Sequence, residues 1–338
     1  MGKKNAVPSV SMKMVGSLAG VSAMTVSRAL KEPDTVSSAT LARIQSVIAR
    51  IGYVPNHVAG SLSSSKSTHV ALVVPSLRTA IFAEIIQGIS DVLKTHGFQL
   101  MISDSSNSPA LEEAAVRGYA AQRVAGVILH NTRHGAGVPR ILAAAGIPCV
   151  ETGDLVRKPI DSVVSFANSA AGAAMAGHLL DAGYRRMAFV SLPVRNRERI
   201  LALRRGFMAR LRKDGVTIPS ELVLEVPTGM ASGAEAIGRI LDLAPTTQVT
   251  MFSGDVLAAG ALFECQRRGV ALPGDMAIAN SDDSELFRNT LPDITSIQAP
   301  RYEIGARAAQ WIVDRVRGTA AAGLIHDVGY SIVQRHST

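Results

Sequence analysis

From residue 70 to residue 280, short apolar runs alternate with segments of helical periodicity, and this alternation restricts the chain to an α/β fold. Strands separated by helices form parallel sheets, so two such series predict two Rossmann-like subdomains with a ligand cleft between them. The apolar runs predict strands near residues 70–74, 99–102, 125–129, 148–150, 161–166, 187–191, 222–226, 248–252 and 276–280. The segments between them predict helices near residues 81–95, 109–121, 138–145, 168–181, 199–213, 231–243 and 255–267.

The first fifth of the chain has a different pattern. Apolar residues at helical spacing over residues 12–51 predict three short amphipathic helices. The segment Ala19-Gly-Val-Ser22 predicts a tight turn, because glycine adopts a left-handed conformation and serine caps the next helix. Two helices joined by such a turn form a helix-turn-helix. On the second helix, Val26 and Ala29-Leu30 are expected to face the core, which leaves a polar face suited to the major groove of DNA.

The net charge is concentrated in this N-terminal part. The 338 residues include 35 Lys and Arg against 27 Asp and Glu, a net charge of +8. Residues 1–66 contain eight basic and two acidic residues, so they carry +6 of that charge. A basic helical unit indicates an anionic partner such as nucleic acid. A second concentration, ten basic residues and one acidic residue over 185–213, is interpreted as a solvated helix face or as the source of a site for an anionic ligand.

Three motifs of the N-terminal part resemble the DNA-binding headpiece of the lactose/galactose repressor (LacI/GalR) family. They are Val21-Ser-Ala-Met-Thr-Val-Ser-Arg-Ala-Leu30, Ile51-Gly-Tyr-Val-Pro-Asn56 and Ala59-x-x-Leu62. The resemblance implies a recognition helix that reads bases with Ala23 and Met24, and a hinge helix over 56–64 whose Leu62 wedges into the minor groove. The DNA-binding residues implied are Ser11, Ser22, Ala23, Met24, Thr25, Ser27, Arg28, Thr35, Tyr53, Asn56, His57, Ala59 and Leu62.

The resemblance continues through the rest of the chain. Segments such as Ala71-Leu-Val-Val-Pro-Ser76 and Leu272-Pro-Gly-Asp-Met-Ala-Ile278 are similar to the effector-binding core of the family, which is periplasmic-binding-protein-like, and are closest to its gluconate-repressor branch. A sugar acid needs a cationic partner, and a guanidinium binds a carboxylate in a bidentate manner. The resemblance implies Arg197 and Arg199 for this role. The full set of effector-binding candidates is Phe82, Arg133, Glu151, Arg197, Arg199, Asp255 and Asp282.

These observations favour an α/β regulator with a three-helix headpiece over 1–55, a hinge and linker over 56–68, and an effector-binding and dimerisation domain over 69–338. The two subdomains are expected at about 69–155 plus 283–300 and 156–282 plus 301–338. The expected partners are operator DNA, a small effector such as gluconate, and a second copy of the chain in a homodimer. The alternatives are an effector that is a neutral or phosphorylated sugar, and a sugar-binding protein without a regulatory role.

An enzyme is not expected, because the chain has no Gly-x-Gly-x-x-Gly, phosphate-binding loop or Gly-x-Ser-x-Gly motif. His130 and His134 lack the glutamate of a zinc-protease helix, so neither a metal nor any other cofactor is expected. Adjacent Asp282 and Asp283 on an extended segment are expected to point apart. Cys149 and Cys265 are expected to be buried free thiols, and there is no signal peptide or membrane-spanning run, so the predicted location is the cytoplasm.

Overall fold

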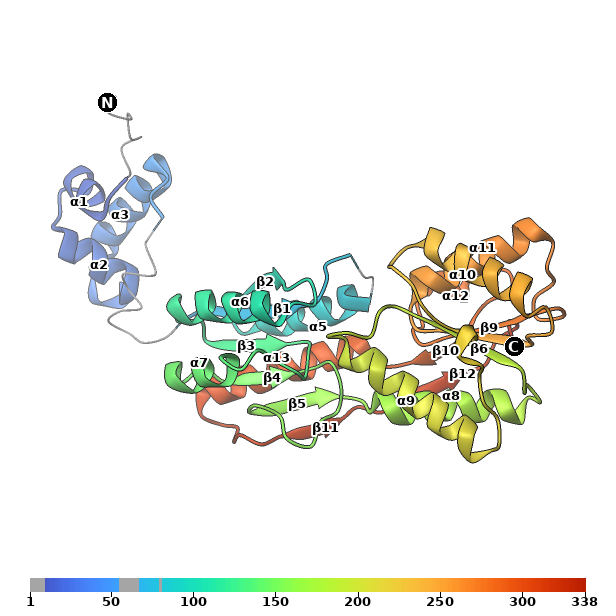
Figure 1. Cartoon of the computed structure of the whole chain (residues 1–338). Helices are drawn as coiled ribbons and strands as arrows, with labels where there is room; N and C mark the ends of the chain where they lie inside the picture. Colours follow the sequence, from blue (N-terminus) through green and yellow to red (C-terminus); the bar gives the residue numbers. More distant parts are fainter. Residues whose placement is uncertain (1–9, 55–66, 79–80) are drawn as a thin grey trace, which may run out of the picture. The chain divides into compact units, whose positions relative to one another are not determined.

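The computed structural model describes residues 10–54, 67–78 and 81–338, and the chain divides into two compact units at residues 66 and 67. The first unit contains the three predicted helices (Figure 1). They are α1 (Met12–Ala19), α2 (Ala23–Lys31) and α3 (Ser38–Ile51), with a short 3₁₀ turn at Pro33–Thr35. Gly20 ends α1 with a φ of 65°, and Ser22 caps α2, as the sequence predicts.

The second unit contains two six-stranded sheets (Figure 1). The first sheet has the order β11-β5-β4-β3-β1-β2, and the second has the order β12-β10-β9-β8-β6-β7. The strands of the first are β1 (His69–Val74), β2 (Gln99–Asp104), β3 (Gly126–Leu129), β4 (Cys149–Glu151), β5 (Ser162–Ser165) and β11 (Ile325–Asp327). Those of the second are β6 (Met187–Ser191), β7 (Val223–Glu225), β8 (Val249–Phe252), β9 (Ala277–Asn280), β10 (Thr295–Gln298) and β12 (Ser331–Val333). Their pairing is parallel except between β10 and β12.

Helices cover both faces of each sheet. Around the first sheet lie α5 (Ile81–Thr95), α6 (Pro109–Ala121), α7 (Val138–Ala145) and α13 (Arg301–Arg317). Around the second lie α8 (Asn168–Asp181), α9 (Glu198–Lys213), α10 (Met230–Leu243), α11 (Asp255–Arg268) and the short α12 (Glu285–Arg288), with a 3₁₀ turn at Ser220–Leu222. Alternate residues of β1 contact opposite layers: Val70, Leu72 and Val74 pack with α5 and α13, whereas Ala71 and Val73 pack with α6 and α7. A strand buried on both faces therefore reads as one continuous apolar run.

Three helix pairs approach so closely that glycine is required on both partners. A Cβ atom built on Gly88 of α5 would lie 2.1 Å from the carbonyl oxygen of Tyr302 on α13, and one on Gly305 would lie 2.1 Å from that of Ile85. The α8 and α9 pair meets in the same way at Gly172 and Gly206, and α10 meets α11 at Gly233 and Gly260. No side chain fits between backbones at this distance, so these helices contact each other directly through their main chains.

The chain passes between the two sheets three times, and this corrects the expected subdomain limits. The crossovers lie between β5 and α8, between β10 and α13, and between β11 and β12. The segment 283–300, expected in the first subdomain, contains β10 of the second sheet, whereas β5, α13 and β11, expected in the second subdomain, belong with the first sheet. Local sequence specifies that a segment is a strand, but the sheet that it joins is decided by tertiary packing.

Candidate functional site

Helix α2 presents a polar face with one large apolar side chain. The hydroxyl of Ser22 accepts a hydrogen bond from the amide of Thr25 at 3.1 Å, Met24 is 72% exposed and Arg28 is exposed. Val26 and Ala29 are buried in the headpiece core. Leu30 was expected there too, but it is 38% exposed because it lies at the rim of the apolar stripe that Val26 and Ala29 fill.

Three other predicted DNA-binding residues of the headpiece make contacts that stabilise its own helices and turns. Ser11 accepts a hydrogen bond from the amide of Met14, the Thr35 hydroxyl donates to the carbonyl of Glu32 at 2.7 Å, and Tyr53 packs in the core. Ala23, Thr25 and Ser27 are half-buried on α2. Asn56, His57, Ala59 and Leu62, with most of the predicted hinge, lie outside the described residues. DNA contact by all of these residues stays a prediction.

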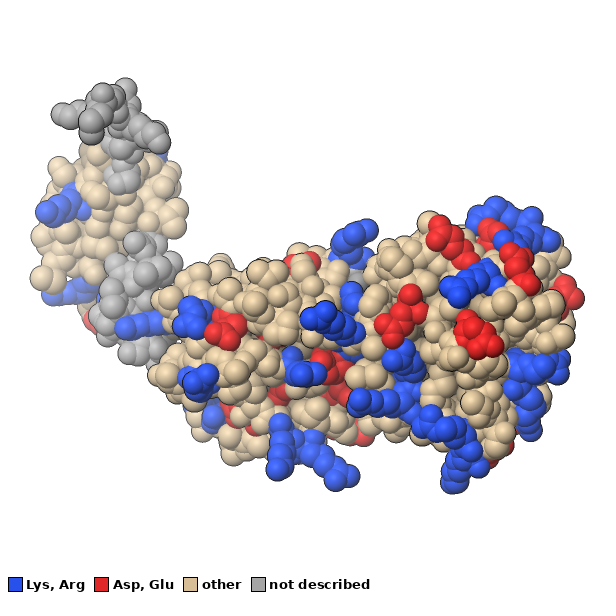
Figure 2. Space-filling view, in the orientation of Figure 1, with Lys and Arg blue, Asp and Glu red and all other residues tan. Residues whose placement is uncertain are grey.

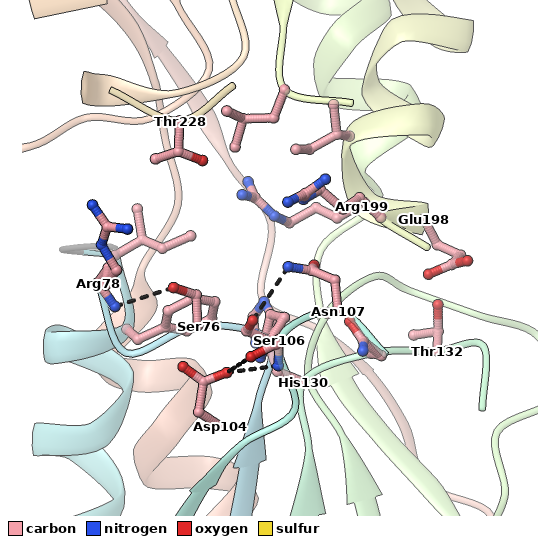
Figure 3. Close-up of a pocket in the computed structure, with 18 residues that line it drawn as sticks. Ser76, Arg78, Asp104, Ser106, Asn107, His130, Thr132, Glu198, Arg199 and Thr228 are labelled. Carbon is pink, nitrogen blue, oxygen red and sulfur yellow. Dashed lines mark hydrogen bonds between the residues drawn. The ribbon is translucent and has the colours of Figure 1, made fainter. Parts of the chain in front are cut away.

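A cavity of about 260 Å³ lies in the second unit, where the carboxyl ends of strands from both sheets meet the start of α9 (Figure 3). Pro75 and Ser76 follow β1 and His130 follows β3, while Leu192 and Thr228 come from loops that follow strands of the second sheet. Open parallel sheets place ligands at this edge. The lining residues are Pro75, Ser76, Arg78, Ile81, Phe82, Asp104, Ser106, Asn107, His130, Asn131, Thr132, Gly153, Leu192, Arg197, Glu198, Arg199, Ile200 and Thr228.

Backbone strain gathers at the wall of this cavity. Ser106 and Asn107 have φ angles of 49° and 57°, and Asn196, next to Arg197 in the chain, has a φ of 57°. Residues other than glycine are uncommon at positive φ, so the surrounding structure must hold these three residues in that conformation. Asp104 does so by accepting hydrogen bonds from the amides of Ser106 at 2.6 Å and Leu77 at 3.1 Å, and Asn107 donates to the carbonyl of Pro75 at 3.2 Å.

Behind the cavity, one buried carboxylate is shared by two guanidinium groups. Arg199 donates to Asp282 at 3.3 Å, and Arg301 at the start of α13 forms a closer ion pair with the same oxygen. Asp282 does not line the cavity itself, so it acts there through Arg199. Its neighbour Asp283 points the other way, as expected, and pairs with Arg335 at 2.6 Å and Arg288 at 3.0 Å.

Asp255 opens α11 near this cluster. Gly254 occupies the N-cap position, and the Asp255 side chain accepts a hydrogen bond from the next amide, that of Val256. Burial and the charge of Asp282 raise the pKa of Asp255. Asp255 does not line the cavity.

Two further candidates were predicted to face the cleft, and the structure places both elsewhere. Arg133 is exposed and does not line the cavity. Glu151 is 1% exposed and accepts hydrogen bonds from His134 at 3.0 Å and from the amide of Ile160 at 2.7 Å. Glu151 is the last residue of β4, and the direction of its side chain is set by partners distant in sequence.

Glu151 belongs to a buried network that anchors the loop after β3. The two ring nitrogens of His134 contact Glu112 of α6 at 2.6 Å and Glu151 of β4 at 3.0 Å, and Asn131 donates to Glu112 at 3.3 Å. Burial alone would lower the pKa of His134, but the hydrogen bonds and charges of the two carboxylates outweigh it and raise that pKa to about 9. His134 is therefore an imidazolium at neutral pH, and it fixes the loop that carries cavity residues Asn131 and Thr132.

The basic cluster over 185–213 has two uses. Figure 2 shows Lys and Arg side chains gathered over α8 and α9. Arg204 pairs with Glu225 at 2.7 Å and Arg210 pairs with Asp214 at 2.5 Å on the helix surface, which fits a solvated face. Arg197 and Arg199, by contrast, line the cavity, as predicted for them, together with Phe82.

Several cavity residues were not predicted from the sequence. Arg78, Asp104, Asn107 and Thr228 line the cavity, and Arg301 holds Asp282. Their shared signal is position, because they end a strand, lie in the loop that follows one, or begin a helix at the carboxyl edge of a sheet. Among the described residues, no group of three His, Cys, Asp or Glu side chains is arranged so that it could hold a metal ion. Both cysteines are free and buried. No helix in the described ranges combines the length and apolar character needed to cross a membrane.

A helix-turn-helix unit joined to a two-sheet unit with a small-molecule cavity defines a class of ligand-controlled DNA-binding regulators. Family comparison agrees: residues 11–56 match the model for bacterial regulatory proteins of the lacI family, and residues 176–338 match that of a periplasmic binding protein-like domain. The chain is 34% identical to the HTH-type transcriptional regulator GntR of Pseudomonas aeruginosa over 95% of its own length and 93% of that protein's. The chain therefore belongs to the LacI family of bacterial transcriptional regulators, and these relatives are regulators rather than enzymes.

Other similarities cover nearly the same length. GntR of Escherichia coli K12 is 31% identical over 93% of this chain and 94% of that protein. A LacI family regulator from Silicibacter pomeroyi superposes with a TM-score of 0.91 at 32% identity, covering 97% of this chain and 99% of that one. The solved complex of the regulator CelR with cellobiose has a TM-score of 0.70 at 28% identity, over 97% of this chain and all of that one.

Proposed function

We propose that this chain is a cytoplasmic repressor that binds operator DNA as a homodimer and responds to a sugar acid such as gluconate. One observation carries the choice of effector. Arg78 and Arg197 line the cavity, and neither has a carboxylate partner among the described residues. Guanidinium groups that line a cavity and have no carboxylate partner are suited to an anionic ligand.

This assignment differs from the pair expected from the sequence. Arg199 is already paired with Asp282 through one nitrogen, so its charge is partly neutralised before a ligand binds. Arg197 is half-buried and donates through one nitrogen to the carbonyl of Pro193 at 2.8 Å, which leaves its other donors for a ligand. Burial lowers the pKa of Arg197, but a guanidinium stays charged at neutral pH. Arg197 and Arg78 are therefore proposed as the carboxylate-binding residues.

A neutral or phosphorylated sugar is the alternative effector. The relative CelR has been solved with cellobiose, a neutral sugar, which favours this alternative. A sugar-binding protein without a regulatory role is not supported, because the lacI family model matches the helix-turn-helix unit. Isothermal titration calorimetry with gluconate, ketogluconates, their phosphates and neutral hexoses decides among the effector classes. Binding of neutral hexoses as tight as that of gluconate would contradict the sugar-acid assignment.

Replacing Arg197 with alanine is expected to weaken gluconate binding roughly 10- to 150-fold, because a charged hydrogen bond to the carboxylate is lost. Arg195→Ala is the matched control, since Arg195 lies two residues away, is exposed and does not line the cavity. The control should bind gluconate as the native protein does. Equal affinities of native protein and Arg197→Ala in calorimetry would reject the proposed carboxylate site.

Replacing Arg28 with alanine is expected to weaken operator binding roughly 5- to 150-fold, as for loss of a side chain that reads a base. The operator is first selected from a random DNA pool, and binding is then measured by gel shift at fixed salt. Arg43→Ala is the control, because it removes the same charge from the exposed side of α3. If both variants lose affinity equally for operator and random DNA, Arg28 is not a base-reading residue.

A further inference from the structure

His130 lines the cavity, and one of its two ring nitrogens is buried without a partner. The residue follows β3 and is 6% exposed, and its Nε2 atom is buried without a hydrogen bond to any described residue. Leaving a buried polar atom unpaired is unfavourable, and such atoms are uncommon in folded proteins. An unpaired nitrogen on a residue that lines a ligand cavity therefore points to a partner that the ligand supplies when the ring meets it.

The tautomer of His130 follows from its other nitrogen. Nδ1 lies 3.2 Å from the hydroxyl oxygen of Thr152, and that hydroxyl donates its proton to the carbonyl of Leu129 at 3.5 Å. The hydroxyl has one proton, and the assignment that satisfies both contacts gives that proton to the carbonyl and lets the hydroxyl accept a hydrogen bond from Nδ1. In the neutral ring Nε2 is then the acceptor.

The ring is also neutral and held in place. Burial, followed by the charges of Arg199 and Arg301, lowers the pKa of His130 to about 3. The ring of Phe82 packs edge-on against it, with ring centres 4.7 Å apart and planes at 89°. His130 is therefore a fixed acceptor in a cavity whose other wall carries guanidinium donors.

We propose that Nε2 of His130 accepts a hydrogen bond from a hydroxyl group of the effector. This inference rests on the proposed function and specifies the effector further. A carboxylate or phosphate oxygen carries no proton, so beside Nε2 its lone pair would face the lone pair of the nitrogen and no hydrogen bond would form. The anionic end of the ligand therefore binds at Arg78 and Arg197. The site thus selects polyhydroxy acids over acids that have no hydroxyl group.

The test is a double-mutant cycle between protein and ligand. Gluconate and its five monodeoxy analogues are titrated into the native protein and into His130→Phe by calorimetry. One analogue is expected to bind the native protein roughly 5- to 100-fold more weakly than gluconate, because Nε2 is again left unpaired. His130→Phe should bind gluconate more weakly than the native protein does, by a similar factor. It should also bind that analogue and gluconate with equal affinity. His130→Gln, which retains an acceptor, should restore part of the difference.

The outcomes separate this inference from the proposed function. If the native protein binds every monodeoxy analogue as tightly as gluconate, the role of His130 is wrong and the sugar-acid effector stands; this result needs no variant to fold. The role of His130 is also wrong if one analogue binds more weakly than gluconate by the same factor in the native protein and in His130→Phe. If the native protein binds neutral sugars but no sugar acid, the proposed effector class is wrong, and the same cycle with deoxy sugars decides the role of His130.

Discussion

His134→Leu is expected to lower the free energy of unfolding by about 3–5 kcal/mol, because it leaves two buried carboxylates without their shared cation. Glu112 and Glu151 are 2% and 1% exposed, and both accept a hydrogen bond from the imidazolium. Urea denaturation at pH 7 measures the loss. Adding Glu112→Gln and Glu151→Gln to His134→Leu should recover part of the stability, since the unpaired charges are removed. A loss below about 1 kcal/mol in the single variant would contradict a charged His134.

The same network predicts how stability changes with pH. The pKa of His134 is about 9 in the folded protein against 6.5 for a free histidine, so the folded state binds the proton more tightly. This contribution is complete below pH 6.5 and is lost progressively as the pH rises through about 9. The difference in pKa corresponds to roughly 3 kcal/mol of unfolding free energy. His134→Leu should lose this dependence between pH 6.5 and 9.

Asp282→Asn is expected to lower the free energy of unfolding by about 3–5 kcal/mol, because it removes the carboxylate that two guanidinium groups share. The side chain of Arg301 is only 6% exposed, so water cannot replace the lost carboxylate as a partner of its guanidinium. The side chain of Arg199 is 20% exposed and can be hydrated. Thermal and urea denaturation measure the effect. Adding Arg301→Met should recover stability by removing the more buried cation. If the double variant is no more stable than Asp282→Asn, the unpaired charge of Arg301 is not the cause of the lost stability.

The sequence predicts the strands and helices up to residue 280 closely because they are buried in a regular way, whereas β10 and α13 beyond that residue were not predicted. Strand β1 is apolar throughout since both of its faces are covered, and the predicted helix over 109–121 has the observed bounds of α6. The short edge strands β11 and β12 were not predicted, because three-residue strands with exposed positions carry little pattern. Their sheet membership depends on crossovers that no local segment specifies.

The cavity was predicted less completely than the fold. Arg197 and Arg199 were placed in its wall from the sequence, but only the structure shows that Arg199 is paired with Asp282, 83 positions further along the chain. Glu151 was predicted as an effector contact, but its carboxylate binds His134, and this contact depends on the direction of the loop after β3. Charge alone predicts neither which arginine is free nor which carboxylate is shared.

The glycine contacts between helix pairs determine where this molecule can bend. In each pair, backbone lies against backbone, so the two helices cannot slide past one another without a main-chain collision. The pair α5 and α13 belongs wholly to the first sheet, and the pairs α8 with α9 and α10 with α11 belong to the second. We therefore expect each half to move as one stiff block, with any change in the angle between the blocks taken up by the three crossovers. The cavity lies between the blocks, so we expect a bound ligand to act through the torsion angles of those connecting residues and through the Arg301–Asp282 ion pair, which joins α13 of the first block to the second block.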